Sequence, residues 1–144
     1  MTEWSDATLA TLHRKGLRNG GARRAVIELL GKQDCCLTAQ EIFDRLRGSG
    51  RRVGIASVYR VLDLLTSEGL LQRIDLGSGI SRYEPARSGG HHHHHLVCDS
   101  CGAVTPFTDQ GLEDAIRRLS GRLPLRVAEH EIVLRGACEA CASG

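Results

Sequence analysis

The sequence contains few aromatic residues and no long apolar segment. Aromatic side chains make up only 3% of the 144 residues, whereas glycine occurs 17 times. This composition predicts a thin hydrophobic core, so we expect one half of the chain to need a bound metal to stay folded. No apolar run approaches the roughly 18 residues that span a bilayer. We therefore expect no membrane association.

The sequence also lacks export and catalytic motifs. The N-terminal MTEWSDATLA has neither the basic nor the apolar region of a secretory signal, which predicts a cytoplasmic protein. In that reducing compartment, six cysteines favour metal or redox chemistry over disulfides. No Ser-His-Asp arrangement, Gly-rich phosphate loop or His-Glu-x-x-His is present. We expect no enzyme activity and no small-molecule substrate.

Basic residues are concentrated in the first part of the chain. Residues 1–85 contain 13 Lys/Arg against 10 Asp/Glu, a net +3, and residues 86–144 contain 6 against 7, a net −1. Five basic residues and no acid occur from Arg14 to Arg24. This local patch indicates contact with nucleic acid better than the overall +2 does.

Within the first 85 residues, helix signals come first and are followed by a predicted β-hairpin. Ser5 or Asp6 can cap a first helix, residues 22–30 form a second, and the capping box Thr38-Ala-Gln-Glu41 opens a third. LLQRIDL and ISRYE alternate apolar and polar residues around a Gly-Ser-Gly turn. This order is typical of a winged helix-turn-helix, although a small α+β domain could use it only for packing.

The segment GIASVYRVLDLLTSEG predicts the recognition helix. Its apolar residues recur at helical spacing, which leaves Ser57, Tyr59 and Arg60 on other sides. The exposed Tyr-Arg pair favours DNA binding over a purely structural helix.

Composition changes after the turn-rich residues 86–90. HHHHHLVC, AVTPF and residues 126–135 predict strands, with a helix over 110–122. We expect an α+β protein with a winged helix-turn-helix domain (1–85), a hinge (86–90) and a small metal-binding α/β domain (91–144).

Two Cys-x-x-Cys pairs predict a structural zinc site. Each pair can form a tight chelating turn, and two such turns complete a tetrahedral Zn²⁺ shell. The ligands would be Cys98, Cys101, Cys138 and Cys141. A redox-active Cys-x-x-Cys is the alternative, but it needs only one pair.

The five consecutive histidines predict two further half-sites. Successive side chains of a strand point to opposite faces. His93 and His95 would therefore face one way, and His92 and His94 the other. A solvated tract that binds metal without specificity is the alternative.

Each half-site needs ligands from elsewhere in the chain. Glu113 and His130 could join His92 and His94, whereas Glu84 and Cys36 could join His93 and His95. The second set would span both domains and couple metal occupancy to DNA binding. Ligation by Cys36 stays open at this point, and Cys35 is expected to point away and be inert.

With these motifs, the sequence resembles the ferric uptake regulator family of metal-dependent bacterial repressors, and within it most closely the zinc uptake regulators. The likeness covers about residues 9–142 and rests on VGIASVYRVLDLLTSEGLL, HHHHHLVCDSCG and CEAC. It implies a homodimer that binds double-stranded operator DNA. It also implies that Tyr59 and Arg60 contact the major groove and that Arg18 enters the adjacent minor groove. The same three metal sites are implied.

The donor types of the interdomain set favour zinc as the sensed metal. One thiolate, two imidazoles and one carboxylate suit Zn²⁺ better than Fe²⁺. We expect a repressor of zinc uptake genes whose DNA affinity falls when this metal is lost. An iron-sensing regulator of the same family is the alternative, and a zinc-storage or thiol-redox protein is an alternative of a different class.

Overall fold

The structure is a computed structural model that describes residues 2–33, 35–86 and 93–143. The chain divides into two compact units, residues 1–91 (unit 1) and residues 92–144 (unit 2). The predicted hinge, 86–90, falls almost entirely outside the described residues, so the predicted domain boundaries stay a prediction. None of the described helices has the length and apolar character needed to cross a membrane.

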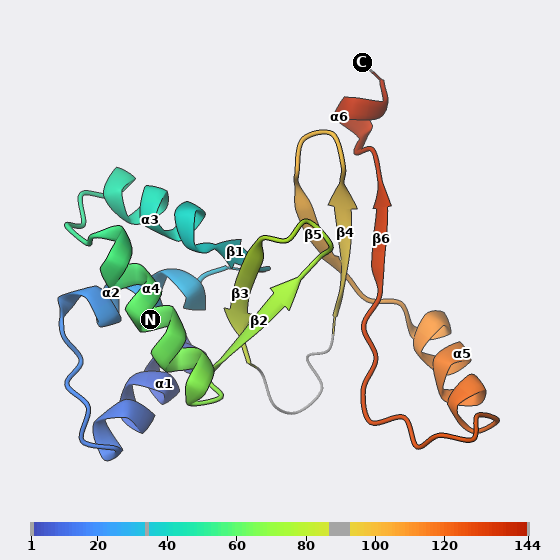
Figure 1. Cartoon of the computed structure of the whole chain (residues 1–144), viewed down its shortest axis with the longest axis horizontal. Helices are drawn as coiled ribbons and strands as arrows, with labels where there is room; N and C mark the ends of the chain where they lie inside the picture. The colour runs from blue at the N-terminus through green and yellow to red at the C-terminus, as the bar shows by residue number, and fades with distance from the viewer. Residues whose placement is uncertain (1, 34, 87–92, 144) are drawn as a thin grey trace. The chain divides into compact units, whose positions relative to one another are not determined.

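The described residues of unit 1 form four helices and a three-stranded antiparallel sheet (Figure 1). The helices are α1 (Glu3–Arg14), α2 (Gly21–Gly31), α3 (Ala39–Gly48) and α4 (Ile55–Ser67). The strands are β1 (Leu37–Thr38), β2 (Leu71–Asp75) and β3 (Ser81–Pro85), in the order β1-β3-β2. This is the winged helix arrangement that the sequence predicts, with the β2–β3 hairpin as the wing.

Local sequence explains where these helices begin. At α3, the Thr38 hydroxyl accepts from the Glu41 N–H and the Glu41 carboxylate accepts from the Thr38 N–H, so the capping box is confirmed. At α1, the expected cap was wrong. Thr2 caps the helix, because its hydroxyl accepts from the Ser5 N–H while the Ser5 side chain is buried against α2.

A single apolar core holds unit 1 together. It takes Leu9 and Leu12 from α1 and is completed by α2, α3 and α4, with Tyr83 closing it from the sheet. Its fully buried large side chains include Leu12, Ile27, Leu30, Ile42, Leu62 and Leu65. After α4, Gly69 adopts φ +72°. The chain thereby reverses into β2 in the left-handed conformation that glycine tolerates best.

Over residues 93–143, unit 2 forms a smaller three-stranded sheet with two helices. Its elements are β4 (His94–Cys98), β5 (Val104–Phe107), α5 (Gln110–Ser120), β6 (Val133–Gly136) and α6 (Glu139–Ala142). β4 lies in the middle, antiparallel to β5 and parallel to β6 (Figure 1). The expectation of a strand over 126–135 was therefore wrong in extent. Pairing starts at Val133 opposite His95, because β4 itself begins only at His94.

Unit 2 has almost no apolar core of its own. Among its described residues, only His94, His95 and Cys98 are buried. No residue of α5 is buried, although its apolar side chains gather on one side of the helix. The weak core agrees with the expectation that this half of the chain depends on something other than apolar packing.

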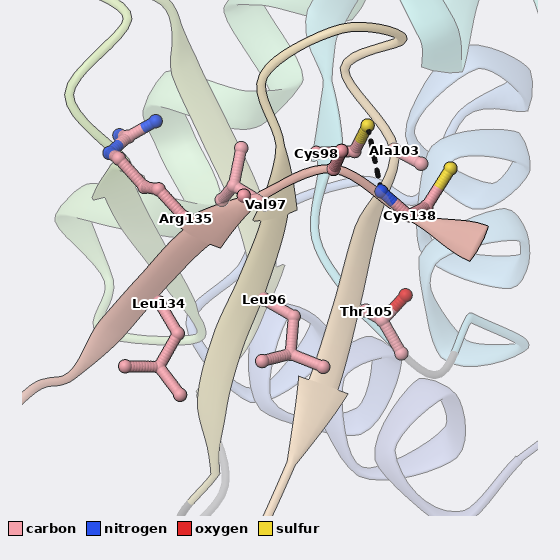
Figure 2. Close-up of a pocket in the computed structure, with 10 residues that line it drawn as sticks. Leu96, Val97, Cys98, Ala103, Thr105, Leu134, Arg135 and Cys138 are labelled. Atoms are coloured by element: carbon pink, nitrogen blue, oxygen red, sulfur yellow. Dashed lines mark hydrogen bonds between the residues drawn. The ribbon is translucent and has the colours of Figure 1, made fainter. Parts of the chain in front are cut away.

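One face of the unit 2 sheet carries a shallow apolar pocket of about 270 Å³. Leu96 on β4 lies opposite Leu134 on β6 and Thr105 on β5, and all three line the pocket (Figure 2). Leu96 is 39% exposed and Leu134 is 52% exposed.

Candidate metal centres and DNA-binding surface

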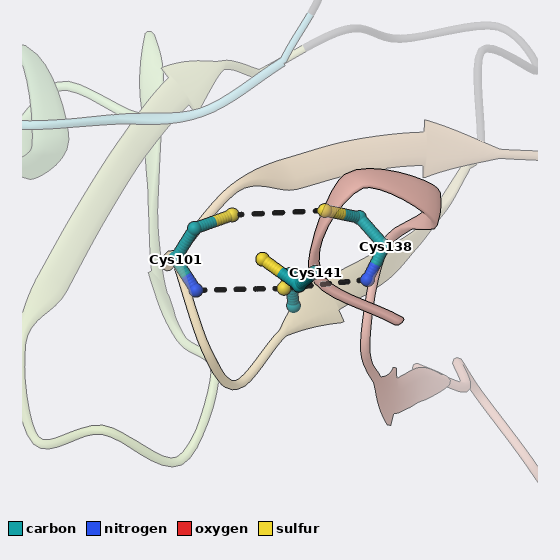
Figure 3. Close-up of side chains that lie close together, drawn as sticks. Cys101, Cys138 and Cys141 are labelled. Atoms are coloured by element: carbon teal, nitrogen blue, oxygen red, sulfur yellow. Dashed lines mark hydrogen bonds between the residues drawn. The ribbon is translucent and has the colours of Figure 1, made fainter. Parts of the chain in front are cut away.

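The four cysteines of unit 2 converge at one end of its sheet. Cys98 ends β4, and Gly102, at φ +77°, closes the turn that brings Cys101 back toward it. Parallel pairing sets Cys98 opposite Gly136, so the second Cys-x-x-Cys follows at the same end of the sheet. Figure 3 shows Cys101, Cys138 and Cys141 turned toward one another. The sulfurs of all four cysteines lie within 4.8 Å of each other.

The spacing of these sulfurs fits a tetrahedral ion. With Zn–S bonds of about 2.3 Å, the edge of a tetrahedron of sulfurs is about 3.8 Å. The Cys101 and Cys138 sulfurs are 3.9 Å apart. The cluster is thus shaped for the zinc ion that the sequence predicts, and the four residues are those that would hold it.

Backbone donors prepare one sulfur of the cluster to be a thiolate. The Cys138 N–H and the Cys101 N–H both point at the Cys98 sulfur, at 3.3 and 3.5 Å. These hydrogen bonds lower the pKa of Cys98 to about 6. The pKa of Cys141 rises instead, to about 12, because it shares hydrogen bonds with the Cys138, Cys98 and Cys101 sulfurs. Four thiolates this close together need a cation among them.

A second group of donors joins the sheet of unit 2 to α5. The Glu113 carboxylate lies 2.6 Å from His94 Nε2 and 2.8 Å from His130 Nε2. These three residues offer ligand atoms within 4.8 Å of one another. They include three of the four residues predicted for the additional site. The fourth, His92, lies outside the described residues.

The hydrogen bonding of His94 bears on how that group could take a metal. His94 Nδ1 accepts from the Ile132 N–H at 3.3 Å, which places the proton of a neutral ring on Nε2, facing Glu113. Ligation through Nε2 would move that proton to Nδ1, where the Ile132 N–H now donates. Metal binding here therefore requires this backbone contact to shift.

His93 and His95 turn to the other side of β4 from His94. The rings of His93 and His95 meet edge to face at 5.0 Å, while His94 packs against Phe107 and His130. The predicted alternation is confirmed over these three residues. His91 and His92, for which it was also predicted, lie outside the described residues.

Unit 1 contributes its own group of donors at the start of β1. The Cys35 and Cys36 sulfurs are 3.7 Å apart, so the expectation that Cys35 points away was wrong. Cys36 is buried and Glu84, on β3, is only 7% exposed. The pKa of Cys36 is raised well above its usual range by its hydrogen bond with Cys35, by burial and by the negative charges of Cys35 and Glu84. Arg82 opposes this shift.

The predicted DNA-contacting residues lie on exposed parts of unit 1. α4 buries Val58, Val61, Leu62 and Leu65, and this leaves Tyr59 49% exposed. The Arg60 guanidinium donates to the Ser57 hydroxyl at 3.0 Å, so these two side chains orient each other. α4 has no acidic residue in its first turn, and its positive N-terminal end would favour phosphate.

The basic patch from Arg14 to Arg24 is less uniform than its sequence indicates. Arg18 is exposed, and its carbonyl oxygen accepts from the Arg23 guanidinium. Lys15 forms an ion pair with Glu68 beyond the end of α4, so part of its charge is neutralised. Arg18 is thus one of the exposed cations of the patch.

A scan against family models matches residues 14–135 to the ferric uptake regulator family. The chain belongs to the ferric uptake regulator family. It is 32% identical to the ferric uptake regulation protein of Bacillus subtilis, over 90% of this chain and 89% of the relative. It is 35% identical to a zinc uptake regulation protein of Mycobacterium tuberculosis, over 89% of this chain and 97% of the relative.

A solved structure of a family member is also similar to this chain. A ferric uptake regulator from Helicobacter pylori, described as having three functional metal-binding sites, superposes with a TM-score of 0.80 at 25% identity. The match covers 96% of this chain and 93% of that structure. The predicted α+β fold class is confirmed, and the protein is a metal-dependent, DNA-binding transcriptional repressor rather than an enzyme. Relatives named for iron and for zinc both match, so the family alone leaves the metal open.

Proposed function

We propose that this ferric uptake regulator senses zinc and represses zinc uptake genes. The observation that carries this proposal is the thiol pair beside Glu84 in unit 1, because thiolate donors favour Zn²⁺ over Fe²⁺ or Mn²⁺, which prefer more oxygen and nitrogen ligands. The M. tuberculosis relative, which is named for zinc uptake, supports the same metal.

The regulatory site is proposed to combine Cys36 and Glu84 of unit 1 with His93 and His95 of unit 2. Each half presents its donors as a group, since Glu84 lies near Cys36 and the two imidazoles meet at 5.0 Å. A bound divalent ion would supply a fixed link between donors from both units. That link would hold the DNA-binding unit at one orientation, so that metal occupancy of the regulatory site changes the affinity for the operator.

Two further sites are proposed in unit 2. Cys98, Cys101, Cys138 and Cys141 would hold a structural zinc ion that replaces the missing apolar core. His92, His94, Glu113 and His130 would form the additional site, for which the two short contacts of Glu113 are the support. The H. pylori relative with three metal-binding sites agrees with this number.

The proposed DNA contact uses α4 and the segment between α1 and α2 in unit 1. Tyr59 and Arg60 would meet base edges in the major groove, with Ser57 holding the guanidinium of Arg60. Arg18 would contact the adjacent minor groove and its phosphates. A palindromic operator requires two copies of this surface at fixed spacing, which a homodimer provides.

The exposed apolar face of unit 2 supports a homodimer. Leu96 and Leu134 leave a pocket open on the sheet, and α5 has an apolar side without a buried residue. Both surfaces would be covered by a second copy of this chain.

The test is selection of DNA by the purified protein under defined metal conditions. The purified protein selects duplexes from a random DNA library under four separate conditions: with Zn²⁺, with Fe²⁺ under nitrogen, with Mn²⁺, and with only the structural zinc present. We expect one palindromic sequence to be enriched with Zn²⁺ at the lowest free metal concentration. Enrichment with Fe²⁺ at a lower free metal concentration than with Zn²⁺ would support the iron-sensing alternative. No enrichment under any condition would support the zinc-storage or thiol-redox alternatives.

A further inference from the structure

The two adjacent thiols of unit 1 form a pair with a defined spacing. Cys35 and Cys36 immediately precede β1, and their sulfurs are 3.7 Å apart. Cys36 is 4% exposed, whereas Cys35 is half-buried. Both sulfurs are thus turned to the same region, although adjacent side chains of a regular strand would diverge.

This spacing matches two sulfurs that share one tetrahedral ion. The expected edge is about 3.8 Å for Zn–S bonds of about 2.3 Å. The corresponding distance between Cys101 and Cys138, in the cysteine cluster of unit 2, is 3.9 Å. A disulfide would need sulfurs about 2.05 Å apart. A thiol–thiol hydrogen bond has similar spacing, so metal binding by the two sulfurs has to be measured to distinguish ligation from hydrogen bonding.

The strand register brings a carboxylate to the same place. β1 pairs with β3 at Leu37 opposite Tyr83. One step further along each strand are Cys36 and Glu84, and facing residues of antiparallel strands point to the same side. Leu37 and Tyr83 belong to the core. Cys36 and Glu84 therefore point away from that core, to the side where a ligand can be held.

Ionisation of both thiols beside Glu84 would need a cation. Two thiolates and a carboxylate would carry three negative charges within a few ångströms. The Arg82 guanidinium is near, but it bonds to the Glu41 carboxylate at 3.3 Å. A divalent ion held by both sulfurs would neutralise the pair directly.

We propose that Cys35 and Cys36 both bind the regulatory ion, so that unit 1 contributes a two-thiolate chelate. This inference rests on the proposed function and adds Cys35 to its four donors. Two thiolates, two imidazoles and the Glu84 carboxylate give five donors, and the soft sulfur ligands among them favour Zn²⁺. The second thiolate would therefore strengthen the preference for zinc over iron beyond what one cysteine gives.

Cobalt(II) tests this directly, because its sulfur-to-metal charge-transfer absorption scales with the number of Co–S bonds. The full-length protein is first loaded with one zinc per chain, which fills the four-cysteine cluster, and Co²⁺ is then added under nitrogen. A separate metal-free sample with one Co²⁺ per chain calibrates four Co–S bonds. The His94, Glu113 and His130 group contains no sulfur and adds nothing to this band.

We expect the second metal to give half of the calibrated intensity. Cys35→Ser and Cys36→Ser should each reduce it to one quarter, and the double variant should remove it. Trp4, the single tryptophan, hydrogen-bonds to the Leu70 carbonyl in unit 1, so its fluorescence reports whether each variant keeps that unit folded.

Other outcomes separate this inference from the proposed function. A quarter-intensity band in the wild type that either single variant leaves unchanged would overturn the two-thiolate chelate but leave a one-thiolate regulatory site. Cobalt bound without any sulfur band would overturn both thiolates. Failure to bind a second cobalt ion, with Trp4 fluorescence unchanged, would instead contradict the proposed regulatory site itself.

Discussion

Removing the structural zinc should unfold unit 2 and leave unit 1 folded. Unit 2 spans 53 residues (92 to 144), and only His94, His95 and Cys98 are buried among those described. At about 0.05–0.15 kcal/mol per residue, an ordinary domain of this size would be stable by about 3–8 kcal/mol. Structural zinc sites bind with about 10–16 kcal/mol. The binding free energy thus exceeds all the stability that unit 2 is expected to have.

Amide hydrogen exchange measures this for each unit separately. In the zinc-loaded protein, the His95 and Cys98 amides should exchange slowly, because they donate to the Ile132 and Ala103 carbonyls. After chelation, with zinc loss verified by elemental analysis, they should exchange at the rate of an unfolded chain. Amides of α2 and α4, and Trp4 fluorescence, should not change, because unit 1 has its own core.

Two matched variants sharpen the test. Cys138→Ser removes one sulfur of the cluster and should reproduce the effect of chelation, whereas Cys35→Ser leaves the cluster intact and should not. Slow exchange of the β4 amides in verified zinc-free protein would show that the sheet of unit 2 is stable without the ion.

Three further substitutions follow from the exposed surfaces. Arg60→Ala should weaken operator binding by about 1–3 kcal/mol, or roughly 5- to 150-fold in fluorescence anisotropy. Arg117→Ala, which removes an exposed arginine paired with Asp114 in unit 2, should have little effect. Arg18→Ala should reduce the slope of log K against log salt by about 0.9 per chain, and an unchanged slope would exclude a phosphate contact. Leu134→Asp should convert the proposed dimer to a monomer in light scattering, because each copy loses about 1.5 kcal/mol or more of free energy from apolar burial. Ile80→Asp, at an equally exposed position on the wing, should leave the oligomeric state unchanged.

Much of unit 1 could be predicted because its signals are local. The capping box at Thr38 and the spacing of Val58, Val61, Leu62 and Leu65 depend only on neighbouring residues, and both are found in the structure. β1 was missed, since two residues are too few for a periodic pattern. Its presence depends on pairing with β3, far away in the sequence.

The candidate metal groups were predictable to the extent that they depend on strand geometry. Alternation separates His94 from His93 and His95, and the Cys-x-x-Cys spacing brings the four sulfurs of unit 2 together. The orientation of the Cys35 side chain could not be predicted from strand alternation. It precedes β1 rather than lying in a strand, so the rule that neighbours diverge does not apply to it.

The affinity of a selected operator duplex, measured with only the structural zinc bound and again with zinc in excess, tests zinc-dependent repression. We expect tighter binding with excess zinc, by about 5- to 150-fold if the coupling is typical of allosteric proteins. In Glu84→Gln, which removes a proposed regulatory ligand but leaves the cysteine cluster, the two affinities should converge. Equal affinities in the wild type, with both zinc loadings verified, would show that zinc does not control DNA binding.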